Sequence, residues 1–371
     1  MKILFLGDYS NLHACLAAEL RGRGHEVTVV SDGGRYMRTE ADVRLDRHPG
    51  AWGTMRYMAD IARIWPRLKG YDVVQLINPH FAALRPGRLR PLLKKLKNNN
   101  GSLFLTLAGD DHFFVKACTE TRTFRFSEYR AGTRRTEFVM REPARESGWM
   151  LPEVADFNRE VYDMVNGAMS VLPEYDMVGR PLLGDRLVFT NIPIDLNALP
   201  YTPLPELGNG QLRILIGMRK AMEVQKGTAR MAKTVGELAR RNPRRFALET
   251  VNSIPLAEYL QRVQANHIVL DQLYSYSPAT NALQTMALGR IAGSGGQPEF
   301  YRAIGWTGAE PVLKLDPLTD IEDSLWRLIR NPEDMAQRSL AGRRLVEQNN
   351  DVRIVARRFE EHWQNILSRT S

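Results

Sequence analysis

A stretch of small and hydroxyl-bearing residues precedes a helical run in the last third of the chain. Residues 274–281 read YSYSPATN, and apolar residues then recur at helical spacing, as at Leu283 and Met286. Gly289 stands where that helix would end, and Ile291 opens an extended segment. Such a loop presents backbone N–H groups and the positive end of a helix dipole, which favour phosphate. An ordinary loop–helix–strand unit explains the same pattern, and on these residues alone both interpretations stay open.

A second set of polar residues comes directly after an apolar run in the first third of the chain. Asp110, Asp111 and His112 follow a predicted strand over residues 103–107. Doubly wound sheets hold ligands at the carboxyl ends of their strands, where a carboxylate or imidazole could orient a substrate hydroxyl. The alternative is that the aspartates cap the next helix and the histidine lies on the surface. We expect no metal here, because adjacent residues at a strand end point in different directions.

Two further segments concentrate positive charge. Residues 85–97 contain arginines and lysines without an acid among them, on a predicted amphipathic helix, and residues 122–145 mix arginines with aromatic residues. This basic and aromatic composition suits an anionic membrane surface and a lipid-diphosphate partner. Nucleic acid would favour it too, but no nucleic-acid-binding motif accompanies it, so we expect no nucleic-acid partner. For the first segment, a plain solvated helix is an equally good interpretation.

Length and composition narrow the class of protein. At 371 residues the chain exceeds what one hydrophobic core usually serves, so we expect two domains. Lysines and arginines number 51 against 42 aspartates and glutamates, a formal net charge of +9 that suits an anionic partner. No apolar run approaches the ~20 residues that span a bilayer, and the opening ILFLG is too short for a signal peptide. Two cysteines without a disulfide or zinc pattern predict a cytoplasmic protein.

The elements that would position these residues alternate between strand and helix. The chain opens with a predicted strand, an amphipathic helix and a second strand, at residues 3–7, 12–23 and 27–31. The turn after the first strand lacks the GxGxxG spacing of dinucleotide-binding loops, so we expect no NAD or FAD. The alternation predicts a parallel sheet covered on both faces. Further strands are predicted at residues 73–77, 103–107, 167–172 and 186–189.

A Pro- and Gly-rich stretch over residues 192–210 is the best candidate for a domain boundary. The alternating pattern then begins again. Strands are predicted at 213–216, 246–251 and 267–270, and helices at 227–241, 256–265, 318–329 and from 334 to the end. We therefore expect an N-terminal domain over residues 1–195 and a C-terminal domain over 196–350, with residues 351–371 packing back on the first.

In this order the chain resembles the GT-B-fold glycosyltransferases, specifically the retaining glycosyltransferase family four (glycosyl transferases group 1). Four segments carry the resemblance, which extends over nearly the whole length. In the first domain, residues 106–111 (TLAGDD) resemble the family's Thr-x-His-Gly or Gly-Ser-Asp segment after a strand. Residues 217–227 resemble the family's Gly-Arg and Lys-Gly segment, residues 271–290 its donor loop and EAMA-Gly helix, and residues 190–195 its Pro-Asn-Gly-Val-Asp segment. The resemblance implies an α/β fold of the GT-B class, with two Rossmann-like doubly wound parallel-sheet domains facing a central cleft.

The resemblance also implies roles for individual residues on the donor side. Arg219, Lys226 and Gly227 would bind the diphosphate of a nucleotide sugar, because cations must neutralise the charge that grows on the leaving phosphate. The residues implied to contact the same diphosphate, the donor sugar and the nucleotide are Tyr276, Ser277, Pro278, Ala279, Thr280, Asn281 and Gln284.

The sequence departs from the family at its catalytic positions. The family carries two glutamates separated by seven residues, and the corresponding residues here are Tyr276 and Gln284. Gln284 keeps the ability to bond a ribose hydroxyl through its amide, whereas Tyr276 supplies no carboxylate charge. Ala108 replaces a family histidine, which leaves the nearby Asp110–His112 as the catalytic candidates.

We therefore expect a cytoplasmic hexosyltransferase, peripheral to the inner membrane face, that needs neither a metal nor another cofactor. By resemblance it would transfer sugar with retention of configuration, from a nucleotide sugar to a glycan or lipid-diphosphate-linked acceptor in surface polysaccharide biosynthesis. Two alternatives remain at this point. One is a non-catalytic GT-B-like protein that binds a glycan or nucleotide, and the other is a nucleotide-sugar epimerase or hydrolase of the same fold.

Overall fold

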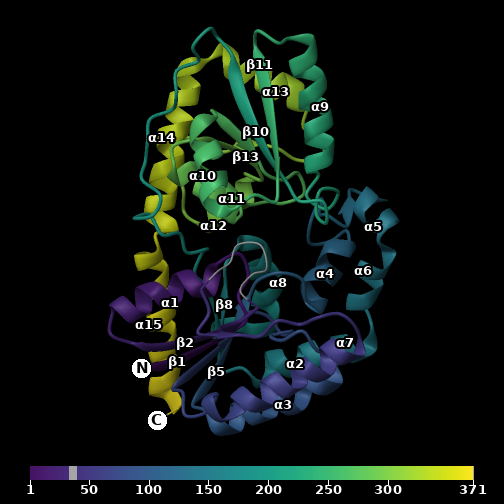
Figure 1. The fold of residues 1–371 in the computed structure, drawn as a ribbon, viewed down its shortest axis with the longest axis vertical. Coiled ribbons are helices and arrows are strands. Elements are labelled where there is room, and N and C mark those ends of the chain that lie inside the picture. The colour runs from purple at the N-terminus through teal and green to yellow at the C-terminus, as the bar shows by residue number, and fades with distance from the viewer. Residues whose placement is uncertain (33–39, 371) are drawn as a thin grey trace. The chain divides into compact units, whose positions relative to one another are not determined.

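The computed structural model describes residues 1–32 and 40–370. Its residue contacts divide into two compact units. Unit 1 is formed by Met1–Ala117, Ala144–Pro193 and Val352–Ser371, and unit 2 by Cys118–Pro143 and Ile194–Asp351. Each unit is built around one parallel sheet with helices on its faces (Figure 1).

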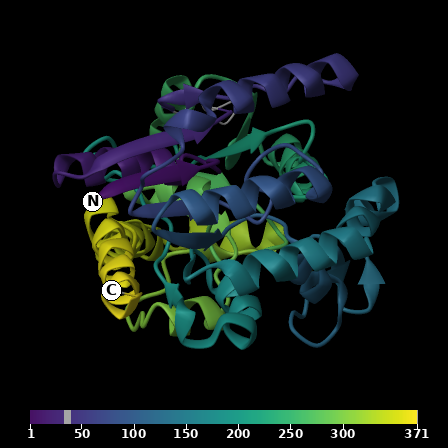
Figure 2. The ribbon, with the colours of Figure 1, turned by 90° about the horizontal axis from the view of Figure 1, so that it is seen from below.

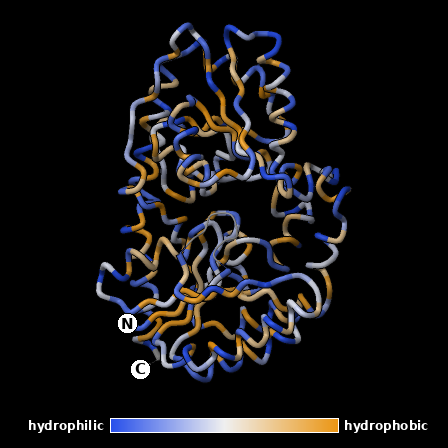
Figure 3. Tube along the Cα trace, in the orientation of Figure 1, coloured by the Kyte–Doolittle hydropathy of each residue, from blue (hydrophilic) through white to orange (hydrophobic). Residues whose placement is uncertain are grey.

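Unit 1 contains a seven-stranded sheet in which every neighbouring pair of strands is parallel. Its strands are short apolar runs, which is typical of a sheet buried on both faces. Figure 3 shows these strands in the colours of hydrophobic residues, with more polar helices around them. In spatial order the strands are β3 (Val43–Arg44), β2 (Glu26–Ser31), β1 (Lys2–Leu6), β4 (Val73–Leu76), β5 (Ser102–Leu107), β8 (Gly167–Ser170) and β9 (Leu187–Phe189).

The helices of unit 1 bury apolar stripes against this sheet. Leu93 of α3 and Phe157 of α7, for example, are fully buried in one core cluster with Leu76 and Leu105. The described helices are α1 (Leu12–Gly22), α2 (Gly50–Ile64), α3 (Pro86–Asn99), α4 (His112–Thr119), α6 (Pro143–Trp149), α7 (Pro152–Met164), α8 (Pro173–Leu183) and α15 (Val352–Thr370), with short 3-10 turns η1 (Trp65–Arg67) and η2 (Gly184–Arg186).

The C-terminal helix α15 completes the core of unit 1. Trp363 is fully buried, and its indole Nε1 donates to Gln75 Oε1 of β4 at 3.0 Å. A Cβ at Gly167 would lie 2.8 Å from His362 Nε2, so only glycine lets α15 approach β8 this closely. Both ribbon views show α15 beside α1 (Figures 1 and 2), where Arg23 Nη1 pairs with Glu360 at 2.7 Å.

Unit 2 repeats the architecture with a five-stranded parallel sheet. In spatial order its strands are β11 (Phe246–Asn252), β10 (Leu212–Met218), β12 (Ile268–Leu270), β13 (Ile291–Ser294) and β14 (Leu313–Lys314). Its helices are α5 (Glu137–Arg141), α9 (Thr228–Arg241), α10 (Leu256–Ala265), α11 (Thr280–Ala287), α12 (Pro298–Ala303), α13 (Ile321–Arg330) and α14 (Pro332–Asn349), beside a two-stranded pair of β6 (Arg130–Ala131) and β7 (Arg134–Arg135).

The structure confirms the predicted strands and most helices to within a few residues, and corrects one element. The helix predicted from residue 334 to the end is wrong as a single helix, because α14 ends at Asn349 and α15 starts at Val352. The break forms because the backbone between the two helices forms hydrogen bonds with another segment of the chain. The Asn350 carbonyl accepts from Ile194 N at 2.7 Å, and Ile194 forms a parallel bridge with Asp351.

Residues 118–143 belong to unit 2, although they lie within the first half of the sequence. The aromatic side chains of this segment are buried, with Phe124 3%, Phe126 7%, Tyr129 1% and Phe138 2% exposed. We had interpreted them as part of a membrane-facing surface. That interpretation is wrong for these four rings, because buried rings cannot enter a bilayer surface.

Candidate functional site

The turn between β10 and α9 positions Lys226 at the carboxyl end of the unit 2 sheet. Gly227 is the N-cap of α9 and has φ +76°, a conformation that glycine adopts without strain. A Cβ there would lie 2.9 Å from Leu273 Cδ1, so glycine also allows close packing on the segment after β12. The carbonyl of Lys226 accepts from Leu273 N at 2.9 Å. The turn is therefore bonded directly to the end of the neighbouring strand.

A chain of polar contacts runs from Lys226 across the sheet edge. Lys226 Nζ lies 3.0 Å from Asp271 Oδ1, which also accepts from Asn281 Nδ2 at 3.1 Å. Asn281 Oδ1 in turn accepts from Tyr259 OH at 2.9 Å. We call Lys226, Asp271, Asn281 and Tyr259 the Lys226 cluster. Because Lys226 precedes α9 and Asn281 lies in the first turn of α11, the starts of two helices meet at Asp271.

Asp271 is the buried centre of the Lys226 cluster, with 3% of its surface exposed. Its second oxygen, Oδ2, is buried and has no hydrogen-bond partner among the described residues. A buried carboxylate oxygen normally has a donor, so this one is suited to accept from a ligand hydroxyl or a water molecule. Reasoning from the sequence placed Asp271 at the start of the resembling donor loop but gave it no role, and it missed Tyr259, since nothing local indicates the pairing of Asp271 with Lys226.

The loop from Ser275 to Ala279 is held by its own polar groups. Ser275 Oγ accepts from Gln272 Nε2 at 2.8 Å and donates to the carbonyl of Ser277 at 2.9 Å. A Cβ at Gly295 would lie 2.3 Å from the Ser275 carbonyl oxygen, so glycine is needed where β13 passes the loop. The loop therefore reaches the start of α11 in a fixed conformation.

At the start of α11, Ala279 is the N-cap and provides no side-chain hydrogen bond to the first turn. Pro278 and Thr280 flank it, and Gln284 lies half-buried in the second turn. An N-terminal turn without a side-chain cap leaves N–H groups that suit an anion. The structure thus places Ser277, Asn281 and Gln284 along one loop and helix start, and their assignment to the donor remains a prediction.

Tyr276 lies in an aromatic cluster rather than in an open loop. Its ring stacks on Phe126, with ring centres 4.8 Å apart, and also contacts Phe124. Its hydroxyl accepts from the backbone N–H of Arg125 at 2.6 Å, and burial raises the pKa of this hydroxyl. Arg125 forms an ion pair with Glu299 beside it. Tyr276 therefore ties residues 124–126 to the loop, and its contact with a donor sugar remains a prediction.

Arg219 and the catalytic candidates have distinct surroundings. Arg219 is exposed directly after β10, and its carbonyl accepts from Met222 N in the turn.

Asp111 in unit 1 is buried and accepts from Phe114 N and from Tyr162 OH, both at 2.7 Å. Burial raises the pKa of the Asp111 carboxyl. These bonds are those of a residue that caps α4, which is the structural interpretation we had left open.

The two neighbours of Asp111 are anchored separately. His112 Nδ1 lies 2.9 Å from the carbonyl of Trp149, a distance at which the nitrogen donates its proton. Asp110 is half-buried, and its backbone carbonyl accepts from Asn78 Nδ2 at 3.0 Å. Asp111 and His112 are thus held by different residues of unit 1, Tyr162 and Trp149, and the catalytic role of all three residues remains a prediction.

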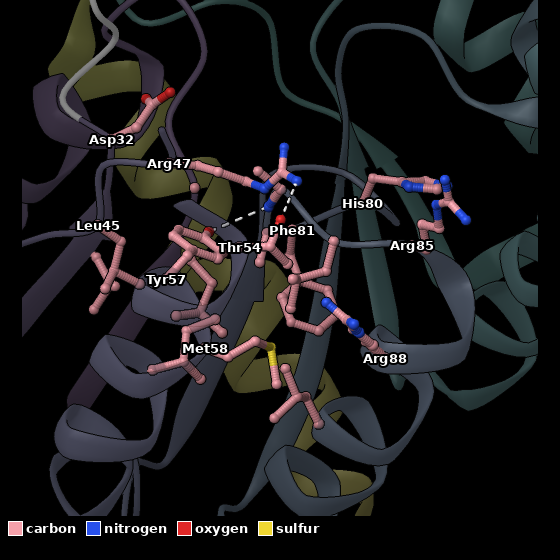
Figure 4. A pocket seen from close by; sticks show the side chains of 18 of the residues that line it. Asp32, Leu45, Arg47, Thr54, Tyr57, Met58, His80, Phe81, Arg85 and Arg88 are labelled. Carbon is pink, nitrogen blue, oxygen red and sulfur yellow. Dashed lines mark hydrogen bonds between the residues drawn. The ribbon is translucent and has the colours of Figure 1, made fainter. Parts of the chain in front are cut away.

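Unit 1 holds a wide pocket of about 1760 Å³ that the sequence did not reveal. It extends from the turn after β1 across α2 to the start of α3, and Figure 4 shows Arg47, His80, Arg85 and Arg88 around its opening. His80 Nε2 accepts from Asn158 Nδ2 at 3.2 Å, and burial lowers the pKa of the His80 imidazole to about 4. The pocket draws on residues between 6 and 154, so only the tertiary fold brings them together.

The basic helix α3 is partly neutralised by α7. Glu160 of α7 lies 2.5 Å from Arg90 Nε and 3.9 Å from Lys94 Nζ. Lys97 donates to Asn166 and is half-buried. Arg88 at the start of α3 is exposed. The positive surface offered by residues 85–97 is therefore smaller than their sequence indicates.

Among the described residues there is neither a metal-binding cluster nor a helix that could span a membrane. No three His, Cys, Asp or Glu side chains of residues 1–32 and 40–370 come together in a way that could hold a metal ion. Over the same residues, every helix is too short or too polar to cross a lipid bilayer.

Known structures of glycosyl-transferring enzymes share this fold. The chain matches sucrose-phosphate synthase from Thermosynechococcus elongatus with a TM-score of 0.62 and 12% identity, over 100% of both chains. It matches Anabaena HepE, solved with UDP-glucose, with a TM-score of 0.57 and 11% identity, over 98% of this chain and 100% of that one. Starch synthase IV from Arabidopsis thaliana, bound to ADP and acarbose, matches with a TM-score of 0.55 and 11% identity, over 99% of both chains.

The GT-B fold class expected from the sequence is confirmed by these structures. No protein-family model and no curated protein matches the sequence. At identities of 11% to 12%, the likeness establishes the fold and not the activity.

Proposed function

We propose that this protein is a glycosyltransferase that moves a sugar from a nucleotide sugar to a glycan or lipid-linked acceptor. One observation carries the proposal. The starts of α9 and α11 meet at Asp271 through Lys226 and Asn281, at the carboxyl end of a parallel sheet. Uncapped helix starts and a lysine are groups that hold a diphosphate. The likeness to structures solved with UDP, UDP-glucose or ADP supports a nucleotide-linked donor.

In the proposed reaction, the bond between the anomeric carbon and the β-phosphate oxygen breaks, and its electron pair leaves with the phosphate. Lys226 neutralises the charge that grows there, and Arg219 adds a bidentate contact. The anomeric carbon bonds to an acceptor hydroxyl oxygen, whose proton passes to the departing phosphate. The products are a nucleoside diphosphate and the lengthened acceptor. We assign the reaction to the retaining, metal-independent hexosyltransferases of surface polysaccharide biosynthesis.

Asp271 has a positioning role in this proposal. Before the donor binds, it holds Lys226 and Asn281 in place through Oδ1. A lysine has three N–H donors, so Lys226 can keep this contact while it binds a phosphate oxygen. The unpartnered Oδ2 of Asp271 accepts from a donor hydroxyl or a bridging water. Gln284 then bonds the ribose through its side-chain amide.

A second candidate is a protein that binds a nucleotide sugar or glycan without turnover. The observation that favours it is Tyr276, which occupies a glutamate position of the family and is packed against Phe124 and Phe126. The site then lacks the carboxylate that the family places near the donor sugar.

Thermal unfolding with UDP, GDP, ADP and their sugars tests the donor site common to both candidates. A specific donor at 100 times its Kd stabilises the folded protein by about 2.7 kcal/mol, which raises Tm measurably. Release or transfer of the sugar from that donor then separates the enzyme from the binder. If none of these nucleotides raises Tm, the proposed donor site is wrong.

We further propose that the enzyme works at an anionic membrane surface, using the exposed cations of α3. The test reverses the charge of Arg88 and Lys95, because Arg90 and Lys94 already pair with Glu160. Each contributes about 1 kcal/mol at such a surface, screened by salt. Sedimentation with anionic vesicles should weaken as salt rises, and should fall in the variant Arg88→Glu/Lys95→Glu. Equal sedimentation of variant and wild type would remove α3 as the contact.

A further inference from the structure

The pocket of unit 1 combines three chemistries on separate walls. One wall is apolar and consists of side chains from α2 and α3, including Met58, Ile61 and Leu92. Two methionines of α2 line it, and Met55 leaves 62% of its surface exposed. Its volume, about 1760 Å³, exceeds the roughly 300–1000 Å³ of pockets that enclose a small molecule. A ligand that fills it must therefore be large and partly apolar.

Arginines form the second wall. Arg47, Arg85 and Arg88 line the pocket and are all exposed. Arg47 Nη2 donates to Thr54 Oγ1 at 2.8 Å, which holds its guanidinium over the opening (Figure 4). Within residues 1–32 and 40–370, no ion pair neutralises any of the three. Arg85 and Arg88 also stand at the start of α3, where the helix dipole adds positive potential. Phosphate is the group that such an arrangement binds best.

Carboxylates form the third wall. Asp8 and Asp32 follow β1 and β2, and Glu153 lies at the start of α7. Carboxylates accept hydrogen bonds from hydroxyl groups and repel phosphate, so they suit a sugar and not the phosphate itself. Since acids and arginines both line the pocket, a ligand needs hydroxyl and phosphate groups in separate places.

We propose that this pocket binds the acceptor of the transfer, and that the acceptor is a lipid joined to a sugar through phosphate. The claim that the ligand is the acceptor rests on the proposed function, because only a transferase has an acceptor. The apolar wall takes the start of the lipid chain, Arg47, Arg85 and Arg88 bind the phosphate, and the carboxylates bind the sugar hydroxyls. The pocket thereby selects one of the two acceptor classes left open above, the lipid-linked one over the free glycan.

Calorimetric titration of the full-length protein tests this assignment with three probes. They are decyl phosphate, decyl glucoside and inorganic phosphate, each kept below its micelle concentration where it has one. We expect decyl phosphate to bind at least ten times more tightly than either of the others, because it alone engages both the apolar wall and the arginines. Equal binding of inorganic phosphate and decyl phosphate would overturn the proposal, since the alkyl chain of the probe would then contribute nothing to its affinity.

Variants locate the contacts. Arg47→Gln/Arg85→Gln/Arg88→Gln should lose at least tenfold in affinity for decyl phosphate and keep its affinity for decyl glucoside. Arg56→Gln is the matched control, because Arg56 is exposed on α2 and does not line the pocket. Met58→Ser should weaken both alkyl probes. Near-ultraviolet circular dichroism checks that each variant folds. A triple variant that binds decyl phosphate as the wild type does would place the head group elsewhere and overturn the proposal.

Titration of the same proteins with the nucleotide identified by thermal unfolding separates this proposal from the proposed function. If decyl phosphate binds in the pocket and no nucleotide binds, the transferase assignment fails and the lipid site stands. If the nucleotide binds and decyl phosphate does not, the lipid acceptor is wrong and the donor site stands.

Discussion

The Lys226 cluster of unit 2 and the pocket of unit 1 arrange their charges in opposite ways. In the cluster, Lys226 Nζ and Asn281 Nδ2 lie 3.0 Å and 3.1 Å from Asp271 Oδ1, so folding itself fixes their positions. In the pocket, Arg47 lies in the loop before α2 and Arg88 lies in α3, around an apolar wall. Short fixed contacts suit a compact anion whose charge develops at one place, such as the leaving diphosphate. A wide pocket suits a ligand that binds through a large apolar contact area and a few charged groups.

Removing Lys226 should have the largest effect, because it breaks the cluster while leaving the pocket intact. Lys226→Ala should cost about 2–4 kcal/mol of transition-state stabilisation, the scale of losing one electrostatic donor. The measurement is kcat/KM for sugar transfer from the donor that raises Tm. Lys233→Ala is the matched control, since Lys233 is an exposed lysine of α9. Arg219→Ala should lower kcat/KM in the same direction.

Lys226→Ala also leaves the buried Asp271 without its cation, so its thermal stability must be followed. Lys226→Arg keeps the charge and should keep the fold, yet its planar fork cannot reproduce the contact of an ammonium. A folded Lys226→Ala protein with wild-type kcat/KM would mean that the cluster does not bind the donor.

Acid should lower the stability of unit 1 through the buried His13. This side chain is fully buried, with Nδ1 2.7 Å from the carbonyl of Gly7 and Nε2 3.1 Å from Thr106 Oγ1. Burial lowers its pKa from 6.5 to about 3. The folded protein therefore resists a proton that the unfolded chain takes up below pH 6.5. Stability that is complete above pH 6.5 is lost progressively as pH falls towards 3, by about 3 kcal/mol at pH 4 from this residue alone.

Urea unfolding at pH 7.5 and at pH 4.5, followed separately for each unit by hydrogen exchange, measures this loss. Gly7 lines the pocket, so unit 1 should lose protection first and binding of decyl phosphate should fall with it. His13→Gln should make unit 1 less stable at pH 7.5 and less sensitive to acid. An identical pH dependence for wild type and His13→Gln would show that another group governs the acid transition.

The fold was predictable from the sequence because each strand is an apolar run and each turn carries its own signal. Gly289, for example, was expected to end a helix, and it follows α11 with φ +78°. The pairing of Lys226 with Asp271 was not predictable, because 45 residues separate them and only the sheet brings them together. The same holds for the pocket, because Arg47 of the loop before α2 and Arg88 of α3 are far apart in the sequence. Residues 118–143 join unit 2 through contacts such as Phe126 with Tyr276, which no local pattern indicates.

The smallest effect should come from replacing Gln284, because this change tests the donor loop alone. We expect its amide to bond a ribose hydroxyl, because it lies in α11 one turn beyond Asn281 of the Lys226 cluster. Gln284→Ala should weaken nucleoside diphosphate and nucleotide sugar alike, by about 1 kcal/mol, because the ribose is common to both. Gln284→Glu should keep or improve the affinity, since a carboxylate makes stronger hydrogen bonds to hydroxyls than an amide does.

Calorimetric titration of both ligands measures these changes, with Gln261→Ala on the exposed face of α10 as the matched control. Binding of decyl phosphate should be the same in all of these variants, because the pocket that holds it belongs to the other unit. An unchanged affinity of Gln284→Ala for nucleoside diphosphate would mean that the family register fails along this loop. Tyr276 would then lose its donor assignment as well, since both positions follow from the same alignment of the two family glutamates. The Lys226 cluster would remain, because its contacts depend on the fold and not on that register.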